Sequence, residues 1–496
     1  MLAPRKLRQI LIGSGLAMTA FGCENDPSEP SITLTVGPSN PVVLVGMSLQ
    51  LESKPIEGTS GTSAIRKWSS SAPTVIDVDS AGLITAKSAG TATITAETGN
   101  GIGEMLVTAE TQSIGLQAKD RTTCGIAANG DGYCWGYNRF GQAGTGTSDS
   151  TLSSPTKVAG GLTFTSISPG ADHSCGTTTT GTHCWGCNST GEIGDGTSAY
   201  NEGKSGTCGT LRLTPVRVAT SPTFTDVEAS GSVLVYQQDA TCSDAICSAQ
   251  TCAITAAGQL YCWGNLVLTP TPVAQSLQFR SLSTSMANIC GLGTDAIIYC
   301  FSAFFGPPAS IQPAAIQGVE PMQALSTGRF HSCSIDRQGR AYCWGANLRG
   351  ELGSPSTETC TRRIFGSYPC RAKPDTVFGG HRFQSISAGG GTPSTSDNPP
   401  VSHTCGVTVG QEIYCWGDNT YGELGNGTQA HSSAPVKIAS DLKFRSVTTG
   451  YGYTCGVTIA GVAYCWGANP SPRAHPPGVS PNSLTPQVVG GGIVFQ

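Results

Sequence analysis

Residues 331–353 read HSCSIDRQGRAYCWGANLRGELG, and the pattern of this segment returns along most of the chain. Its Cys-Trp-Gly occurs six times. Between residues 111 and 496, seven Cys pairs alternate strictly with seven segments of the form Pro-x-x-Val/Ile-x5-Phe/Met, which gives a unit of about 55 residues. A repeat of this length predicts a propeller or a solenoid, not a single irregular domain.

The cysteine spacing predicts cross-strand disulfides. Six pairs are ten residues apart and one is nine apart. Around a short central loop, this spacing places both Cys opposite each other on an antiparallel hairpin, where their Cα atoms lie about 4.5–5.5 Å apart and can be bridged. We therefore expect the disulfides Cys124–Cys134, Cys175–Cys184, Cys252–Cys262, Cys290–Cys300, Cys333–Cys343, Cys405–Cys415 and Cys455–Cys465.

Six further cysteines lie outside these hairpins. The closest partners in sequence give Cys187–Cys208, Cys242–Cys247 and Cys360–Cys370, although spacing alone leaves this connectivity open. Cys184 and Cys187 also form a C-x-x-C motif, the spacing of redox and zinc sites. Because the repeat already pairs Cys184 with Cys175, we interpret this motif as structural.

A Trp follows the second Cys in six units and should pack between neighbouring units, because it points away from the Cys on the same strand. These residues are Trp135, Trp185, Trp263, Trp344, Trp416 and Trp466. His173, His331 and His403 recur two residues before the first Cys of their units. Recurrence at one position of a repeat favours packing or hydrogen bonding over metal binding.

The repeat resembles the regulator-of-chromosome-condensation repeat, a family of seven-bladed β-propellers. The likeness covers nearly all of residues 111–496. Unit three lacks the Gly-rich tail, and unit four has CFSAFFG in place of Cys-Trp-Gly, so these blades are expected to be distorted. The family name implies guanine-nucleotide exchange on a small GTPase, with chromatin binding.

Ring closure follows from the order of the signals. The first Cys pair has no Pro…Phe segment before it, and the last such segment has no Cys pair after it. We therefore expect LTPQVVGGGIVFQ at the C-terminus to complete the blade that SIGLQAKDRTTC begins. Closing the ring in this way removes an exposed sheet edge.

The first 22 residues predict a lipoprotein signal peptide. Arg5, Lys6 and Arg8 precede an apolar run that ends at Gly22-Cys23. Cys23 is the expected lipidation site, although Ala20 stands where this motif usually has Leu; ordinary cleavage with a spare Cys is the alternative. Residues 23–30 would then be a tether. Export agrees with the 21 Cys, because removing Cys23 leaves an even number.

Residues 31–110 contain no Cys and alternate apolar and polar side chains, which predicts a small β-sandwich. The segment resembles the bacterial immunoglobulin-like group 2 domain. Trp68, Asp79, Gly82, Leu83 and the strand from Gly90 to Ile94 carry this resemblance. It implies a spacer or adhesion module of a surface protein and no chemistry.

The fold class that follows is all-β: an immunoglobulin-like sandwich followed by a seven-bladed propeller with disulfide-stapled blades. The net charge of −4 and the absence of a basic stripe argue against a nucleic-acid partner. We find no catalytic motif, no metal site and no sign of a cofactor. A hydrolase or lyase on the propeller face is an alternative that inward-facing Asp, Glu or His in the channel would favour.

The binding hypothesis rests on four insertions. We name the strands of a unit a to d in chain order. The insertions 197–213 and 354–373 lie in c–d connections, and 231–250 and 390–402 lie in a–b connections, so all four should project from one face. Stapled loops on a rigid scaffold are typical of a recognition surface. We expect a monomer, anchored in the outer membrane or at the cell surface, that binds an extracytoplasmic protein or glycan.

Overall fold

The computed structural model describes residues 32–37, 41–44, 48–55, 65, 67–98, 101–110, 115–198, 208, 210–219, 222–231, 249–285, 288–302, 313–317, 321–356, 358–362, 366–390, 402–468 and 482–495. All regular elements in these ranges are β-strands. The same residues include no helix that is long and apolar enough to cross a membrane. The expected all-β class is confirmed.

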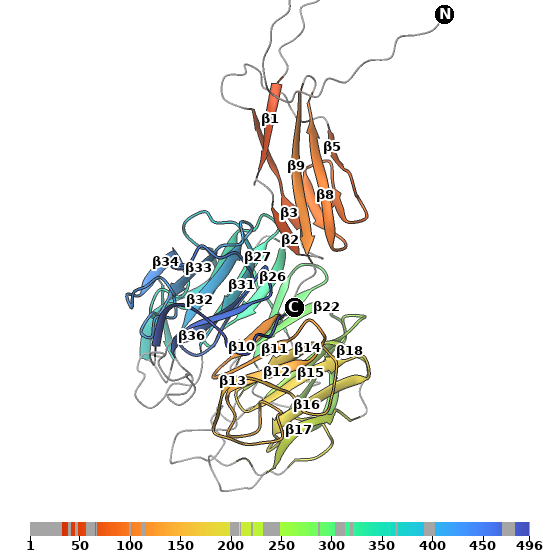
Figure 1. Ribbon diagram of the computed structural model, residues 1–496, viewed down its shortest axis with the longest axis vertical. Helices are drawn as coiled ribbons and strands as arrows, with labels where there is room; N and C mark the ends of the chain where they lie inside the picture. The colour runs from red at the N-terminus through yellow and green to blue at the C-terminus, as the bar shows by residue number, and fades with distance from the viewer. Residues whose placement is uncertain are drawn as a thin grey trace, which may run out of the picture.

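The first nine strands form a two-sheet sandwich (Figure 1). One sheet has the order β4-β1-β9-β8-β5 with β2 beside β9, and the other has the order β3-β7-β6. Ile76, Ile84, Ile94 and Val107 are fully buried between the sheets. The strands are β1 Ile32–Gly37, β2 Val42–Leu44, β3 Ser48–Gln50, β4 Glu52–Pro55, β5 Lys67–Ser70, β6 Ile76–Val78, β7 Leu83–Ala86, β8 Gly90–Glu97 and β9 Gly101–Glu110.

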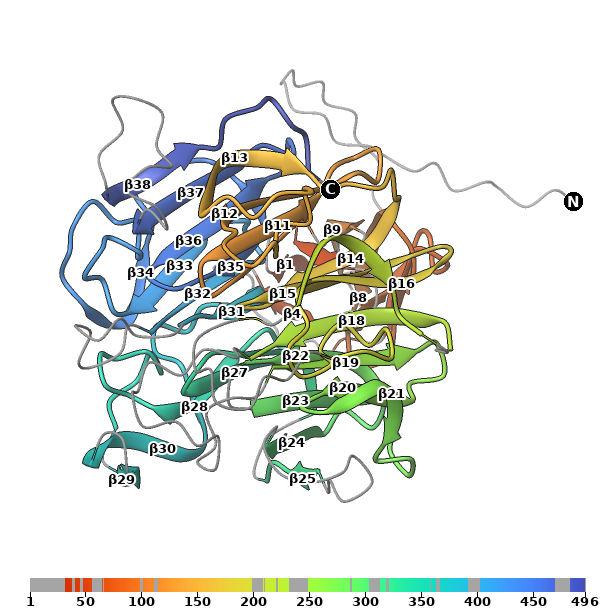
Figure 2. The same ribbon diagram turned by 90° about the horizontal axis from the view of Figure 1, so that it is seen from below.

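Seven antiparallel sheets follow and are arranged as the blades of a propeller (Figure 2). Blades 1 to 4 consist of β10 Leu116–Lys119, β11 Thr122–Ile126, β12 Gly132–Tyr137 and β13 Thr151–Lys157; β14 Phe164–Pro169, β15 His173–Thr178, β16 Gly181–Cys187 and β17 Leu211–Arg217; β18 Phe224–Ser230, β19 Gln250–Thr255, β20 Leu260–Gly264 and β21 Val267–Val273; and β22 Phe279–Thr284, β23 Asn288–Gly293, β24 Ile298–Ser302 and β25 Ala314–Ala315.

Blades 5 to 7 consist of β26 Met322–Thr327, β27 His331–Asp336, β28 Ala341–Ala346, β29 Glu358–Arg362 and β30 Gly366–Thr376; β31 Phe383–Ala388, β32 His403–Thr408, β33 Ile413–Gly417 and β34 Ser432–Lys437; and β35 Phe444–Thr449, β36 Tyr453–Thr458, β37 Ala463–Ala468 and β38 Asn482–Val488. Strand a of each blade lies innermost, and strands b, c and d follow outward in chain order except in blade 5, where β30 precedes β29.

Each blade is held by a disulfide between directly opposed residues of strands b and c. Cys124 faces Cys134, for example, and their Cα atoms are 4.1 Å apart. The same arrangement occurs in all seven blades. In the six ten-residue hairpins, the third loop residue has positive φ; four are Gly, and Ala296 and Gln411 adopt the same left-handed conformation. The expected disulfide-stapled blades are therefore present.

The Gly of Cys-Trp-Gly is required by a close backbone approach. Strand d shifts register between the second Cys and this Gly, so the Trp occupies a β-bulge. At Gly136, a Cβ atom would lie 2.3 Å from the Arg121 carbonyl oxygen of the a–b turn. Gly345 would meet the Phe330 carbonyl oxygen at 2.4 Å, and both residues have positive φ. No other residue type fits this position without moving the backbone.

The six Trp side chains pack on the preceding blade. Trp185 of blade 2 lies in one apolar cluster with Cys124 and Cys134 of blade 1, and Trp263, Trp344, Trp416 and Trp466 repeat this relation around the ring. Trp135 of blade 1 packs with Tyr453 and Cys455 of blade 7. Each disulfide therefore serves as part of the surface that the next blade covers.

The irregular units differ in how far they depart from the repeat. Blade 3 keeps four full strands, and Asn265 and Leu266, both with positive φ, close its c–d hairpin as a two-residue turn. The expected distortion is therefore wrong for the sheet of blade 3. Blade 4 has an outer strand of only two residues, Ala314–Ala315. In blade 5, the insertion adds strand β29 beyond β30.

Ring closure differs in detail from the expectation. Residues 482–488 form the outer strand of blade 7, paired with β37, and not a strand of blade 1. The contact with blade 1 is made by the last residues: Phe495 forms a bridge with Ala127, and the Ala128 amide donates to the Val494 carbonyl oxygen. Phe495 thus takes the place that Phe164 or Phe224 holds at the start of strand a in other blades. The C-terminus lies beside blade 1 in Figure 2.

The sandwich contacts the propeller at blades 5 and 6. The Ser48 amide donates to Gln323 Oε1 at 2.8 Å, and the Gln50 amide donates to the Arg337 carbonyl oxygen at 3.2 Å. Both donors lie on β3, an edge strand that would otherwise leave them unpaired. Arg382 and Glu52 form an ion pair at 3.6 Å. These propeller residues lie at the start of strand a or in b–c and d–a connections, so the sandwich occupies the face opposite the a–b turns.

We predict that Phe495→Ala lowers the stability of the propeller. Phe495 is 2% exposed and lies 5.9 Å from the Trp135 ring, measured between centroids. Removing a buried Phe costs about 3–5 kcal/mol and here would also open the junction between blades 7 and 1. Thermal unfolding should show a lower Tm, whereas Phe378→Ala, at a residue that is 51% exposed, should leave the Tm nearly unchanged. An equal effect of both substitutions would contradict closure through Phe495.

Candidate functional site

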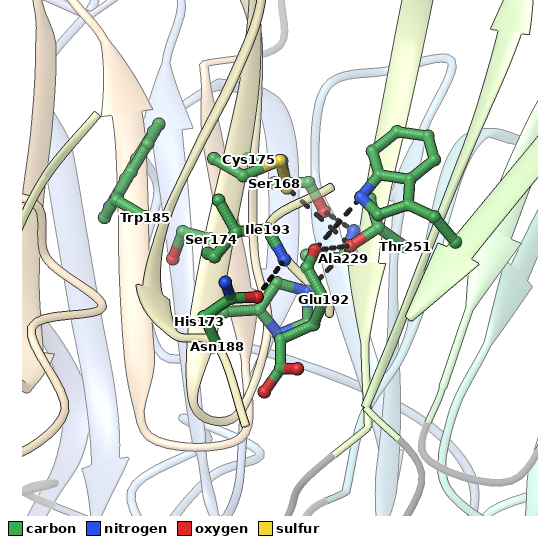
Figure 3. The surroundings of a disulfide bond; sticks show 12 residues. Ser168, His173, Ser174, Cys175, Trp185, Asn188, Glu192, Ile193, Ala229 and Thr251 are labelled. Atoms are coloured by element: carbon green, nitrogen blue, oxygen red, sulfur yellow. Dashed lines mark hydrogen bonds between the residues drawn. A yellow bond between two sulfur atoms is a disulfide. The ribbon is translucent and has the colours of Figure 1, made fainter. Parts of the chain in front are cut away.

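A shared carbonyl oxygen joins neighbouring blades on the side of the a–b turns (Figure 3). The Glu192 carbonyl oxygen of blade 2 accepts from Trp263 Nε1 at 3.0 Å and from Thr251 Oγ1 at 2.9 Å, both in blade 3. Equivalent bonds reach the carbonyl oxygens of Gln142, Glu351 and Glu423 from Trp185, Trp416 and Trp466. The Gly-Glu/Gln-x-Gly tail of one unit is therefore the acceptor for the Trp of the next.

The recurring histidines belong to the same junctions. His173 Nε2 lies 2.9 Å from Thr251 Oγ1, and His331 and His403 contact Thr404 and Thr454 at 2.8 Å. Because each Thr hydroxyl donates to the Glu carbonyl oxygen, it must accept from the His, which places the proton on Nε2. These residues hold blades together. Within the described ranges, no group of three His, Cys, Asp or Glu is arranged to hold a metal ion.

Burial strongly shifts the pKa values of the Glu and His side chains in these junctions. It raises the pKa of the Glu192 and Glu351 carboxyl groups to about 7 and moves that of Glu423 in the same direction. It lowers the pKa of His173, His331 and His403 to about 3. Both shifts favour the uncharged form, which is the form that a buried group without a counter-ion adopts. Blade 1 has Gln142 at the position of these Glu residues, so a neutral side chain fits there.

We predict that Glu351→Gln stabilises the protein at alkaline pH relative to the wild type. The folded-state pKa of Glu351 is above its ordinary value of 4.5. The stability that this carboxyl group contributes to the folded protein is therefore fully present below pH 4.5 and is lost as the pH rises through about 7. A shift of this size corresponds to roughly 3 kcal/mol. The Tm difference between E351Q and wild type should therefore increase from pH 5 to pH 8.

The matched control is Glu412→Gln, at a side chain that is 32% exposed and whose carboxylate is held by Lys437 and Lys443. The pKa of Glu412 lies below its ordinary value, so it stays ionised between pH 5 and 8. Its Tm difference from wild type should remain constant over this range. A constant difference for E351Q as well would show that Glu351 does not titrate on folding.

The centre of the ring contains a cavity of about 610 Å³, lined by strands a of six blades and by Gly170 and Ala171 in the a–b turn of blade 2. In each blade, one strand-a residue lies opposite the first Cys. These residues are Gln117, Ser168, Glu228, Ser283, Ser326, Ser387 and Thr448. In five blades, its hydroxyl accepts a hydrogen bond from the backbone amide of the next blade, for example Ser326 from Ala388 at 2.9 Å. A ring of hydroxyl groups therefore joins the inner strands.

Blade 3 departs from this ring by carrying acids. Glu228 replaces the hydroxyl, and Asp226, two residues earlier, stands where Ser166, Ser281, Ser385 and Ser446 stand in other blades. Both side chains line the cavity. Burial and the neighbouring Glu228 raise the pKa of Asp226 well above its ordinary range. Inward-facing carboxyl groups are the feature that the sequence alone could not establish.

Lys119 of blade 1 crosses the cavity to this wall. Its ammonium group forms an ion pair with Glu228 and donates to Ser168 Oγ at 3.2 Å and to the Ala229 carbonyl oxygen at 3.0 Å. It also donates to Thr284 Oγ1 at 3.0 Å. One lysine therefore connects the inner strands of blades 1 to 4. Sequence reasoning missed Lys119, Asp226 and Glu228, whose only signal is a charge at repeat positions that are otherwise neutral.

Some of the remaining predicted cysteines and insertions lie in the described residues, and others lie outside them. The structure joins Cys187 to Cys208 and Cys360 to Cys370, with Cα separations of 5.7 and 5.8 Å. Cys184, the other half of the C-x-x-C motif, is bonded to Cys175. Cys23, Cys242 and Cys247 lie outside the described residues, as do most of the insertions 197–213, 231–250 and 390–402. The insertion 354–373 forms part of an outer-edge hairpin and is not a free loop.

Comparison with known proteins identifies both parts of the chain. One model of the regulator of chromosome condensation (RCC1) repeat matches residues 129–176, 338–392 and 412–457. A second model of this repeat matches residues 323–351. The group 2 bacterial Ig-like domain matches residues 32–108.

Two curated relatives match about a quarter of the chain. Human E3 ubiquitin-protein ligase HERC2 is 28% identical over 128 residues, which are 25% of this chain and 2% of that protein. The ultraviolet-B receptor UVR8 of Arabidopsis thaliana is 27% identical over 126 residues, 25% of this chain and 24% of the receptor. The matched stretch thus spans only a small part of these relatives.

Solved structures share the propeller fold. Prp20p of Saccharomyces cerevisiae aligns with a TM-score of 0.56 and 16% identity over 74% of this chain and 88% of its own. Human WBSCR16 aligns with a TM-score of 0.53 and 15% identity over 71% and 89%. The chain therefore carries regulator-of-chromosome-condensation repeats in a disulfide-stapled β-propeller, preceded by a group 2 bacterial immunoglobulin-like domain.

Proposed function

We propose that the protein is an exported, lipid-anchored binding scaffold that presents one face of its propeller to an extracytoplasmic protein or glycan. The observation that carries the proposal is the position of two insertions. Gly231 and Gly390 stand at the start of insertions in a–b connections, and both line the central cavity. The insertions at blades 3 and 6 therefore start at the same mouth of the channel.

The placement of the sandwich supports this assignment of the binding face. Its contacts with Arg337, Arg382 and Val409 lie on the opposite face of the propeller. The a–b mouth is left uncovered by these contacts, and Figure 1 shows the sandwich at one end of the long axis and the propeller at the other. Anchoring through Cys23 would then direct the insertions away from the membrane.

Export is supported by disulfides and by domain type. The nine disulfides of the structure are typical of proteins from oxidising compartments. Group 2 bacterial Ig-like domains are typical of surface or exported proteins. A cytosolic exchange factor for a small GTPase, the activity that the family name implies, does not need disulfide-stapled blades. We therefore propose binding in place of nucleotide exchange.

We predict that the a–b insertions determine partner binding. A short Gly-Ser linker in place of 232–248 or 391–401 should abolish capture of the partner from an envelope extract, because these segments adjoin the channel mouth. The comparison variant replaces 199–207, an insertion expected on the same face but in a c–d connection between outer strands, and should retain capture if the partner binds at the channel mouth. Pulldown followed by mass spectrometry measures both. Undiminished capture by both a–b variants would contradict binding at this face.

The acid pair in the channel favours a hydrolase or lyase as the second candidate function. Asp226 has a raised pKa and is suited to donate a proton, whereas Glu228 is held in an ion pair with Lys119. Two carboxyl groups in different environments are the arrangement that acid–base catalysis uses. If this candidate is correct, the protein should release nitrophenolate from at least one member of a panel of 4-nitrophenyl glycosides and esters. Asp226→Asn and Glu228→Gln should each lower that rate at least 100-fold.

The control variant for this assay is Asp131→Asn, at a half-buried turn residue outside the channel whose carboxylate pairs with Lys157. It should leave any hydrolytic rate unchanged. A rate that survives both channel substitutions would exclude these carboxyl groups as catalytic residues.

A further inference from the structure

We propose that the channel wall of blade 3 binds a cationic group, an alkylammonium or a guanidinium, with the Asp226 carboxylate as its counter-ion. The inference rests on the proposed binding function and specifies the chemistry of the partner: a Lys or Arg side chain that enters the cavity. The inference comes from comparing blade 3 with the other blades, which have neutral residues at the positions of Asp226 and Glu228.

The first observation is an acid that forms no ion pair within the described residues. Two acids replace neutral residues in blade 3, and of the cations that line the cavity, Lys119, Arg280, Arg329 and Arg445, it is Lys119 that pairs with one of these acids, Glu228. Lys119 is committed to Glu228 and to acceptors in blades 2, 3 and 4. In the described residues, no cationic side chain contacts Asp226, whose carboxylate interacts with the backbone amides of Val227 and Leu282. An ionised Asp226 therefore leaves one negative charge without a partner.

The second observation lies across the cavity in blade 6. Gln384 is 5% exposed and lines the same cavity, yet neither its Nε2 nor its Oε1 has a hydrogen-bond partner. The Ser385 hydroxyl group is unpartnered as well. A buried amide without partners costs free energy unless a ligand satisfies it. Gln384 can both donate to and accept from the backbone of a bound peptide, while Asp226 holds the basic side chain.

The charges that act on Asp226 come from blades 1 and 3. Arg280 and Arg445 line the cavity at the other mouth, but their guanidinium groups donate to the carbonyl oxygens of Met322, Thr458 and Ile459. The strands on either side of blade 3 present Ser168 and Ser283 at the level of Glu228. Asp120 and Arg329 also line the cavity, and the charged groups that act on Asp226 are Glu228 and Lys119.

Binding should be linked to proton release. Because burial and Glu228 raise the pKa of Asp226, the empty site carries a proton near neutral pH, and a bound cation would displace it. Affinity should rise with pH as Asp226 ionises.

The test is calorimetric titration of the full chain with acetyl-Gly-Lys-Gly-amide and acetyl-Gly-Arg-Gly-amide. Acetyl-Gly-norleucine-Gly-amide is the neutral control, and cadaverine distinguishes a free amine from a peptide. We expect a basic peptide to bind, the norleucine peptide to bind at least tenfold more weakly, and two buffers of different ionisation enthalpy to reveal proton release. Asp226→Asn should weaken binding at least tenfold and abolish proton release.

Two further variants complete the design. Gln384→Ala should weaken binding of the peptide but not of cadaverine. Glu412→Gln, at an acid that does not line the cavity, should change neither affinity. Retained Tm in D226N shows that the variant is folded. Equal affinity for the norleucine peptide, full affinity in D226N, or no binding at millimolar peptide would overturn the proposal. The pulldown tests the proposed function separately. If the a–b insertions are needed for partner capture, the proposed function holds even when one of these results excludes the cation site.

Discussion

The junction between blades depends on one carbonyl oxygen that a Trp and a Thr of the next blade share. Neighbouring blades have no continuous backbone ladder between them, so side chains must provide the directional contacts. The Trp reaches this oxygen because it occupies a β-bulge, and the bulge forms because Gly allows the a–b turn to approach the strand closely. The disulfide in the Trp's own blade keeps strands b and c in the register that this geometry needs.

The same constraint explains which blades are irregular. Blade 4 has Phe301 and Ser302 in place of Trp and Gly, and no equivalent of the carbonyl junction enters it from blade 3, where the c–d connection is a two-residue turn. Its inner strand keeps the hydroxyl link from Ser283 to the Thr327 amide. The inner ring therefore continues where the outer junction is lost. Blade 3 shows the reverse combination: its junction with blade 2 is complete, but its inner position carries an acid.

The two faces of the propeller have different roles in this structure. One face supports the sandwich, whose edge strand β3 gains partners for amides that would otherwise be exposed. The other face carries the a–b connections, where the chain tolerates insertions because their ends remain fixed by the blade. The channel between the faces is lined largely by hydroxyl and amide groups, and its carboxyl groups belong to blades 1 and 3.

Much of the fold could be predicted from the sequence, because the propeller is built from local hairpins. Ten-residue spacing determined the disulfide pairs, and the period of the repeat determined the number of blades. The C-terminal strand was assigned to the wrong blade, because its pattern contains both an outer strand and the inner Phe495, and only the closed ring separates them.

The charged groups of the channel depended on tertiary structure. Lys119 and Glu228 are more than a hundred residues apart and form an ion pair only when blades 1 and 3 share an axis. The roles of His173 and Glu192 were hidden for the same reason: each partner lies on the next blade. Local spacing specifies what a hairpin contains, whereas the closure of seven blades decides which side chains meet between them.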